Sequence, residues 1–130
     1  MAKTREPAKV LLLGASGYIG RHAMAALGRS WTIGTYCNTP FDRGIYFDPA
    51  KMCVRDIIPS GAKIEYAVIL FAQLGLDACK ADLAASNEIN VRSAIRAIDE
   101  LIELGIKPVY TSSQAVFDGE KGGYTEDDIP

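Results

Sequence analysis

The sequence predicts an α/β fold in which a doubly wound parallel sheet of about five strands lies between helices. Short apolar runs alternate along the chain with segments whose apolar residues recur at threes and fours, which is helical spacing. The first apolar run also ends in a glycine turn that opens directly into such a segment. This alternation implies right-handed crossovers, with helices on both faces of the sheet.

The first unit is a strand, a glycine turn and a helix. Residues 9–13 are almost wholly aliphatic, which is typical of a strand covered on both faces. The helix after the turn carries Ile19, Ala23 and Leu27 on one side, and its small residues Gly20, Ala23 and Ala26 are expected to let it lie close to the sheet. Gly28 is expected to end the helix.

Three further strands are predicted in the middle of the chain. They are rich in apolar and β-branched residues and cover residues 31–36, 45–47 and 65–72. Residues 37–44 and 73–81 are expected to be loops. Residues 50–58 are expected to form a helix, with Val54, Ile57 and Ile58 on its apolar side.

The longest helical pattern comes before the last predicted strand. Its apolar residues are Val91, Ala94, Ile95, Ile98, Leu101 and Ile102. Gly105 follows the last of them, as expected just beyond a helix end. Residues 108–112 are predicted to be the fifth strand, and turn-forming residues dominate the chain after it.

Composition excludes several classes of function. The chain has 130 residues and a net charge of −2, without a basic block, which argues against a nucleic-acid-binding surface. Its three cysteines and one histidine lack the spacing of a metal site, so we expect reduced thiols and no metal. No segment has the length of a membrane span or the pattern of a secretory leader, so we expect a cytoplasmic protein.

The spacing of Gly14, Gly17 and Gly20 predicts a phosphate-binding turn. Gly14 permits the tight turn after the strand, Gly17 lets the backbone approach a pyrophosphate, and Gly20 lets the helix pack closely on the strand. The N–H groups at the start of the helix would then face the phosphates.

This GxxGxxG turn, with Ala15-Ser16 inside it and Tyr18-Ile19 near its end, resembles that of the extended short-chain dehydrogenase/reductase superfamily. The resemblance implies a Rossmann-type domain that binds NAD or NADP at this turn. The cofactor contacts that it implies here are Gly14, Ser16, Gly17, Tyr18, Ile19, Gly20 and Arg21.

The end of the second strand bears on the choice of cofactor. NAD-preferring sites place an Asp or Glu there, where it hydrogen-bonds the ribose 2′-hydroxyl. This chain has Cys37 and Asn38 instead, and its first acid, Asp42, lies in the following loop. Arg21 and Arg43 are cations available to a 2′-phosphate, or else ordinary surface residues. We therefore expect NADP, with NAD as the alternative.

The resemblance also implies site residues after the third and fourth strands. Asp48 matches an Asp that hydrogen-bonds the adenine amine, and it can equally cap the following turn. Phe71, Ala72 and Gln73 would lie beside the riboses and nicotinamide. Asn90, on a mainly apolar helical face, either shapes the site or is structural.

Residues 109–130 resemble the dTDP-4-dehydrorhamnose reductase branch, whose pattern is S-[ST]-D-x-V-F-D-G, then glycines, then Y-x-E-x-D-x-P. Residues 116–119 match it outright. The branch's catalytic hydroxyl falls on Ser113, beside Ser112 at the strand end, where it would polarise the substrate carbonyl during hydride transfer. Gln114-Ala115 departs from the pattern, and Ser113 can instead be a turn serine.

The superfamily's proton donor is missing from this chain. It is a Tyr four residues before a Lys, and no tyrosine here has a Lys at that offset. In the family that motif follows shortly after the point where this chain ends. We therefore expect a loose tail at residues 1–7 and, over residues 8–130, a truncated dinucleotide-binding domain without its substrate domain.

The predicted function is NAD(P)H-dependent reduction of a nucleotide-linked 4-keto sugar, as in dTDP-rhamnose biosynthesis, with these 130 residues inactive on their own. One alternative is a non-catalytic NADP-binding regulatory subunit, like that of methionine adenosyltransferase. Another is a sugar-nucleotide epimerase or dehydratase. The expected partner is a small sugar-nucleotide substrate, and exposed apolar sheet edges would also permit self-association.

Overall fold

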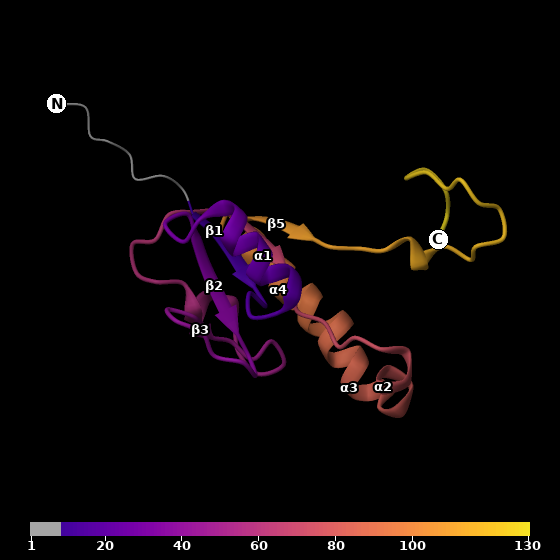
Figure 1. Ribbon diagram of the computed structural model, residues 1–130, viewed down its shortest axis with the longest axis horizontal. Coiled ribbons are helices and arrows are strands. Elements are labelled where there is room, and N and C mark those ends of the chain that lie inside the picture. Colours follow the sequence, from indigo (N-terminus) through magenta and orange to yellow (C-terminus); the bar gives the residue numbers. More distant parts are fainter. Residues whose placement is uncertain (1–8) are drawn as a thin grey trace.

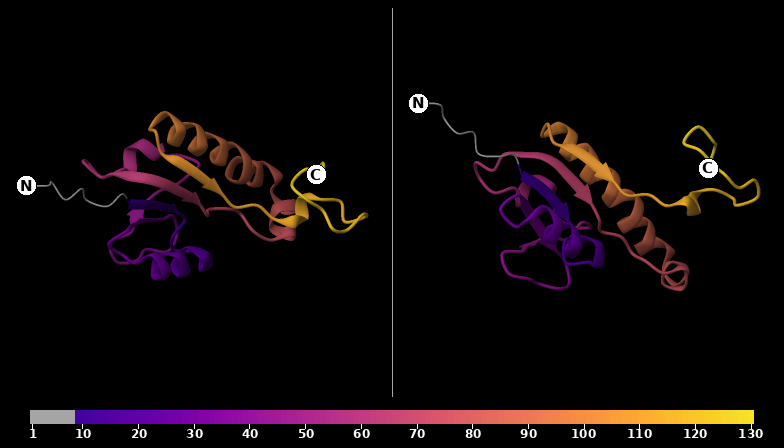
Figure 2. Two further views of the ribbon diagram at one scale, coloured as in Figure 1. Left: turned by 90° about the horizontal axis from the view of Figure 1, so that it is seen from above. Right: turned by 45° about the horizontal axis from the view of Figure 1, so that its top comes forward.

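The structure is a computed structural model that describes residues 9–130. A five-stranded parallel sheet in the order β3-β2-β1-β4-β5 forms its centre, so the predicted fold class is confirmed. The strands are β1 (Lys9–Leu13), β2 (Thr32–Tyr36), β3 (Ile45–Tyr46), β4 (Ile64–Ile69) and β5 (Lys107–Tyr110). Helices α1 (Tyr18–Leu27) and α4 (Ala94–Glu103) lie on opposite faces of the sheet (Figures 1 and 2). The predicted tail at residues 1–7 is outside the described residues.

Strand β1 is the centre of the fold. Leu11 pairs with Ile33 of β2 on one side and with Ala67 of β4 on the other. Leu11, Leu12 and Leu13 have no exposed surface, because α1 and α4 cover both faces of the strand. This burial explains why the strand is a continuous aliphatic run rather than an alternating one.

Helix α1 packs on the sheet through Gly20, one of the small residues expected to allow a close approach. Its buried residue is Gly20, whereas Ile19 and Leu27 are 62% and 46% exposed. The helix backbone at Gly20 lies directly against Ala15, and this contact turns the Gly20 side toward β1. Gly28 ends the helix as predicted, with a φ of 88° and its N–H donated to the Met24 carbonyl.

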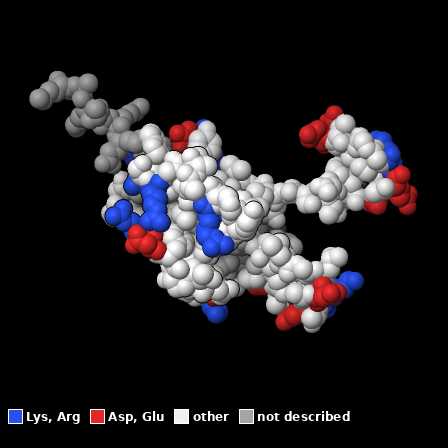
Figure 3. Space-filling view, in the orientation of Figure 1, with Lys and Arg blue, Asp and Glu red and all other residues white. Residues whose placement is uncertain are grey.

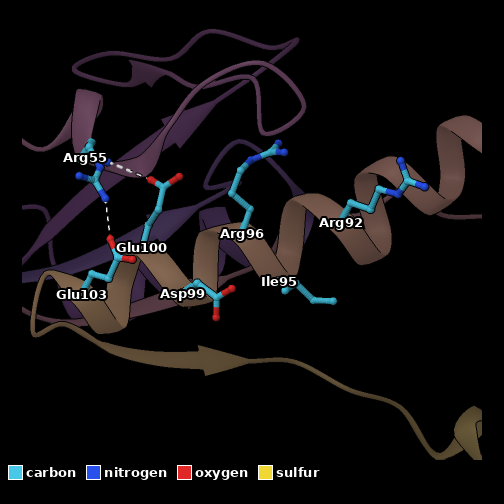
Figure 4. Close-up of a pocket in the computed structure, with 7 residues that line it drawn as sticks. All are labelled: Arg55, Arg92, Ile95, Arg96, Asp99, Glu100 and Glu103. Carbon is cyan, nitrogen blue, oxygen red and sulfur yellow. Dashed lines mark hydrogen bonds and ion pairs between the residues drawn. The ribbon is translucent and has the colours of Figure 1, made fainter.

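The prediction of a helix over residues 50–58 is wrong. A 3₁₀ turn, η1 (Val54–Ile57), takes its place. The Lys51 and Met52 N–H groups both bond back to the Asp48 carbonyl, so these residues belong to a separate turn. Glu100 on α4 accepts the Val54 N–H at 2.6 Å, which places the start of η1 against α4 (Figure 4).

Strand β4 is shorter than predicted, and a helix follows it where a loop was expected. The Leu70 N–H donates to Leu13, the last residue of β1, so the ladder has no partner for residues 71–72. Helix α2 (Leu76–Ala81) then begins after Gly75, whose φ is 93°.

The long helical pattern is a helix with an irregular start. It consists of α3 (Leu83–Asn87), capped by the Asp82 carboxylate, then a π-helical stretch η2 (Glu88–Ser93), then α4. Helix α4 buries Ala94, Ala97, Glu100 and Leu101. The predicted apolar side is only partly correct, because Ile95 and Ile102 are 54% and 60% exposed. The extra residue in each π-helical turn rotates the helix that follows it.

None of the described helices is both long and apolar enough to cross a membrane.

The contact between Glu100 and η1 gives a first prediction. The Glu100 carboxylate is buried and accepts both the Val54 and the Arg55 N–H, the latter at 3.4 Å. We expect Glu100→Ala to lower the free energy of unfolding by about 2 kcal/mol, because two backbone donors lose a charged acceptor. Urea denaturation measures the change. Asp99→Ala, at an exposed position of the same helix, is the matched control, and an equal loss in both variants would contradict this role for Glu100.

Candidate functional site

A cavity of about 660 Å³ lies at the carboxyl ends of β1, β2, β3 and β4. The glycine turn and the first residues of α1 form one wall. The ends of the other three strands, the segments that follow them and Ile89 of the π-helical stretch form the rest. The predicted cofactor residues that line this cavity are Gly14, Ser16, Gly17, Tyr18, Ile19, Gly20, Asn38, Asp48, Phe71, Ala72 and Gln73.

Two of the three glycines in the turn are required by the fold itself. Gly14 has a φ of 96°, and a Cβ there would lie 2.8 Å from the Phe71 backbone nitrogen. A Cβ at Gly20 would lie 2.5 Å from the Ala15 Cα. Both distances are shorter than any real Cβ contact, so each of these residues has to be glycine for packing reasons.

Gly17 differs from the other two glycines. Its φ of −70° suits any residue, and the nearest atom to a Cβ there is the Gly14 carbonyl oxygen at 3.4 Å. Gly17 is exposed and lines the cavity. The fold therefore does not require glycine here, and a side chain would occupy the space through which a ligand approaches the backbone.

The start of helix α1 at this wall carries no protein cap. Its N-cap residue is Gly17, no side chain among residues 9–130 accepts a hydrogen bond from its first turn, and no acidic residue lies in that turn. The first N–H groups of a helix need an acceptor and carry partial positive charge. The wall is therefore suited to an anionic group such as a pyrophosphate.

Thr35 fixes the glycine turn to strand β2. Its buried hydroxyl accepts the Gly14 N–H at 2.9 Å and donates to the Leu12 carbonyl at 3.3 Å. The Thr35 carbonyl also accepts the Ala15 N–H. Sequence reasoning treated Thr35 only as a strand residue, because its partners are about twenty residues away in the chain.

The lining at the end of β2 carries no acidic residue. It consists of Tyr36, Cys37, Asn38 and Thr39. Burial, and after it the negative charge of Asp48, raises the pKa of the Cys37 thiol, so this group is neutral at physiological pH. A 2′-phosphate placed at this strand end would meet no carboxylate from it.

Asp48 caps a turn, one of the two roles that the sequence left open, and it also lines the cavity. Its Oδ1 accepts the Ala50 N–H at 3.0 Å, which caps the turn after β3. Its Oδ2 pairs with Lys51 at 3.1 Å, and the side chain is 13% exposed at the cavity wall. The hydrogen bond and charge of Asp48 raise the pKa of the exposed Lys51 ammonium.

Asn90 holds the backbone of the opposite wall. Its side-chain oxygen accepts the Gln73 N–H at 2.7 Å, and its side-chain nitrogen donates to the Gln73 carbonyl at 3.0 Å. It does not line the cavity itself; Gln73 does. Asn90 belongs to the π-helical stretch before α4. It therefore holds in place Gln73, a cavity residue that lies beyond the end of strand β4.

The remaining predicted site residues lie elsewhere. Arg21 is exposed on α1 and does not line the cavity, and Arg43 lines a separate cavity on the other side of the β2–β3 loop. Ser112 and Ser113 are exposed in the segment after β5, which runs away from the sheet (Figures 1 and 2). The Ser113 hydroxyl accepts the Ala115 N–H at 3.2 Å and so caps a 3₁₀ turn, η3 (Gln114–Val116).

Several lining residues were not predicted: Thr35, Tyr36, Cys37, Thr39, Phe47, Pro49, Leu70, Leu74 and Ile89. Most of them directly adjoin predicted residues at the strand ends. Ligands bind outside the carboxyl ends of parallel strands. Applying this rule to the whole segment at each strand end, rather than to single residues, would have indicated most of these residues.

A parallel sheet with a glycine turn after its first strand and a cavity across its carboxyl ends is the Rossmann type of dinucleotide-binding fold. Comparison with solved structures agrees. The chain is similar to a hypothetical dTDP-4-dehydrorhamnose reductase from Sulfolobus tokodaii, with a TM-score of 0.81 and 24% identity over 94% of this chain and 45% of that chain. It is also similar to MoeE5 in complex with UDP-glucose and NAD, with a TM-score of 0.79 and 25% identity over 95% of this chain and 42% of that chain.

A third match is a short-chain dehydrogenase/reductase superfamily protein from Agrobacterium tumefaciens with bound NAD (TM-score 0.65, 24% identity, 83% of this chain and 33% of that chain). The predicted resemblance is thus confirmed, and this chain spans less than half the length of these structures. Further matches include a UDP-N-acetylglucosamine 4-epimerase and an L-threonine dehydrogenase. No protein-family model matches the chain, and the comparison with curated proteins finds no match.

Alanine substitutions at the three glycines of the turn are expected to change the free energy of unfolding differently. We expect Gly14→Ala and Gly20→Ala each to lower the free energy of unfolding by about 2–3 kcal/mol, because the added Cβ overlaps fixed backbone. Gly17→Ala should leave it unchanged or raise it by up to about 1 kcal/mol, because Ala restricts the unfolded chain at a φ that it readily adopts. Urea denaturation of the three variants tests this, and a large loss for Gly17→Ala would contradict the distinction.

The contact made by Asn90 predicts a local effect. In Asn90→Ala the Gln73 N–H loses its acceptor, so we expect its amide hydrogen exchange to accelerate by about tenfold or more. Amides in the middle of β1 should be affected far less. Unchanged protection at Gln73 would show that Asn90 does not hold this wall.

Proposed function

We propose that this chain is the dinucleotide-binding part of an NAD(P)H-dependent reductase that acts on a nucleotide-linked 4-keto sugar. The observation that carries the proposal is the open space at Gly17. The fold tolerates a side chain at this position, whereas a side chain there would obstruct a ligand in the cavity. This space lies beside the uncapped start of α1, where backbone N–H groups and the helix dipole favour a phosphate.

The cavity offers groups for each part of a dinucleotide. The glycine turn and the start of α1 would hold the pyrophosphate, and Asp48 would accept a hydrogen bond from the adenine amine. Phe71, Ala72 and Gln73 would lie beside the riboses and nicotinamide, with Asn90 holding Gln73 in place. A bound nicotinamide cofactor supplies the hydride for reduction of the carbonyl.

NADP is proposed over NAD because the lining at the end of β2 carries no carboxylate and its thiol, Cys37, is neutral. Arg43 faces another cavity, so the 2′-phosphate would depend on neutral donors such as Asn38 and Thr39 and on Arg21 at the surface of α1. MoeE5, at 25% identity, binds NAD, and NAD is the alternative.

Ser113 is proposed to hydrogen-bond the substrate oxygen in the complete reductase. Among the described residues, the Ser113 hydroxyl oxygen accepts one backbone N–H and the hydroxyl donates to no acceptor. The hydroxyl proton is therefore available to a substrate. A Tyr–Lys pair from outside this chain would supply the proton. The dTDP-4-dehydrorhamnose reductase-like motif at residues 116–119 supports the choice of substrate class.

A second candidate is a non-catalytic NADP-binding subunit. It is favoured by the position of Ser113, which caps η3 and does not line the cavity. An epimerase or dehydratase would use the same cavity with NAD. Activity assays on a 4-keto sugar nucleotide with a version of the chain extended to include a Tyr–Lys pair would separate a reductase from a subunit that only binds.

Cofactor binding is tested directly by calorimetric titration of NADPH and NADH into the wild-type chain and Gly17→Ala. We expect NADPH to bind more tightly than NADH to the wild type, and Gly17→Ala to weaken either by at least about tenfold, because the methyl group blocks the approach to the backbone. Ala26→Ser, at an exposed position of α1, serves as the control. Equal binding by Gly17→Ala would refute the proposed site, and tighter NADH binding would overturn the preference for NADP.

A further inference from the structure

A second cavity, of about 240 Å³, lies at the opposite end of the sheet from the dinucleotide cavity. It is lined by Lys9, Thr32 and Ile45, which are the first residues of three adjacent parallel strands. Apart from Arg43, none of the residues named here belongs to the predicted cofactor site.

The rim of this second cavity is positively charged. Lys9, Arg29 and Arg43 line it together with a single acid, Asp42. Asp42 pairs with Arg29 at 3.1 Å, and within residues 9–130 neither Lys9 nor Arg43 has an ion-pair partner. Lys and Arg side chains gather over β1 and β2 in Figure 3. A local excess of two positive charges in a chain of net charge −2 favours an anionic ligand.

The walls of the cavity are apolar. Met24 from α1 and Phe41 from the β2–β3 loop meet above Gly34 of β2. A Cβ at Gly34 would lie 2.8 Å from the Met24 sulfur and 2.9 Å from the Phe41 ring, so glycine allows both side chains to reach the sheet. Methionine adapts its shape to what it packs against. The volume and walls therefore suit a small apolar body rather than a bare inorganic ion.

Arg43 is held in an unfavourable backbone conformation at the rim. Its φ is 62°, in the left-handed region that favours glycine, and it is the one non-glycine residue with positive φ among residues 9–130. The turn is closed by the Gly44 N–H, which donates to the Phe41 carbonyl at 2.9 Å. Strain of this kind persists where the surrounding structure imposes it, and it concentrates at sites of function.

From these observations we propose that the second cavity binds a small organic carboxylate with an aromatic or branched aliphatic body. The carboxylate would pair with Arg43 and Lys9, and the apolar body would pack against the side chains of Met24 and Phe41. Arginine binds a carboxylate through two parallel hydrogen bonds, which gives the site its preference for that group.

Benzoate, benzamide and inorganic phosphate are the probes that test this proposal. Each is titrated into the ¹⁵N-labelled chain, and amide chemical shifts are followed by NMR. We expect benzoate to shift the amides of residues 41–45 and of Met24, and benzamide and phosphate to bind at least about tenfold more weakly. Benzamide binding as tightly as benzoate would overturn the role of the charge, and phosphate binding as tightly would overturn the apolar body. No shift with benzoate would refute the site.

Variants at Arg43 complete the test. Arg43→Gly removes the cation and also relieves the backbone strain, so this variant is expected to fold and to bind benzoate about tenfold more weakly. Arg43→Lys should keep part of the affinity. Arg92→Gln, on the surface of α4, is the control and should bind as the wild type does. Equal benzoate binding by Arg43→Gly would contradict the proposal.

Discussion

The close backbone contact between the glycine turn, strand β1 and helix α1 determines most of what this molecule can do. Gly20 lies against Ala15, and Gly14 lies against the Phe71 backbone, at distances that leave no room for a Cβ. The buried Thr35 hydroxyl then ties the Gly14 N–H to strand β2. These contacts set the direction of α1, so that its uncapped first turn points across the carboxyl ends of the strands. The anion site proposed at that point would be a consequence of packing, and Gly17 is the place where the packing leaves space.

Helix α4 and the π-helical stretch before it support the same cavity from the other face of the sheet. Asn90 holds Gln73, Arg96 donates to the Pro49 carbonyl, and Glu100 accepts the Val54 N–H. Each of these side chains satisfies backbone groups of a segment that follows a strand. On the same helix Glu100 is buried, whereas Ile95 and Ile102 are exposed. Burial on α4 is therefore decided by partners for loop backbone as well as by apolar area.

The loop between β2 and β3 contributes residues to both cavities, although they lie at opposite ends of the sheet. Cys37, Asn38 and Thr39 line the proposed dinucleotide site, and residues 41–43 of the same loop line the second cavity. Tyr36 packs edge-on against Phe41, with ring centroids 6.1 Å apart, and so connects the two sites. The proposed catalytic Ser113 stands apart from both, in a segment whose contacts are local, such as the stacked rings of Phe117 and Tyr124. Binding groups are thus organised by the sheet, and the groups proposed for turnover are not.

The sequence by itself determined the fold class, the order of strands and helices and the position of the glycine turn. These follow from local patterns: aliphatic runs, helical spacing and glycines at fixed intervals. It did not determine which side of α4 faces the sheet, or that residues 50–58 form only a short turn. Nor did it show that Arg43 and Gly17 belong to different cavities. Those features depend on contacts between residues far apart in the chain, such as Glu100 with Val54 and Thr35 with Gly14. A buried backbone group takes whichever acceptor the assembled fold brings within reach, and that acceptor exists only once the strands have paired.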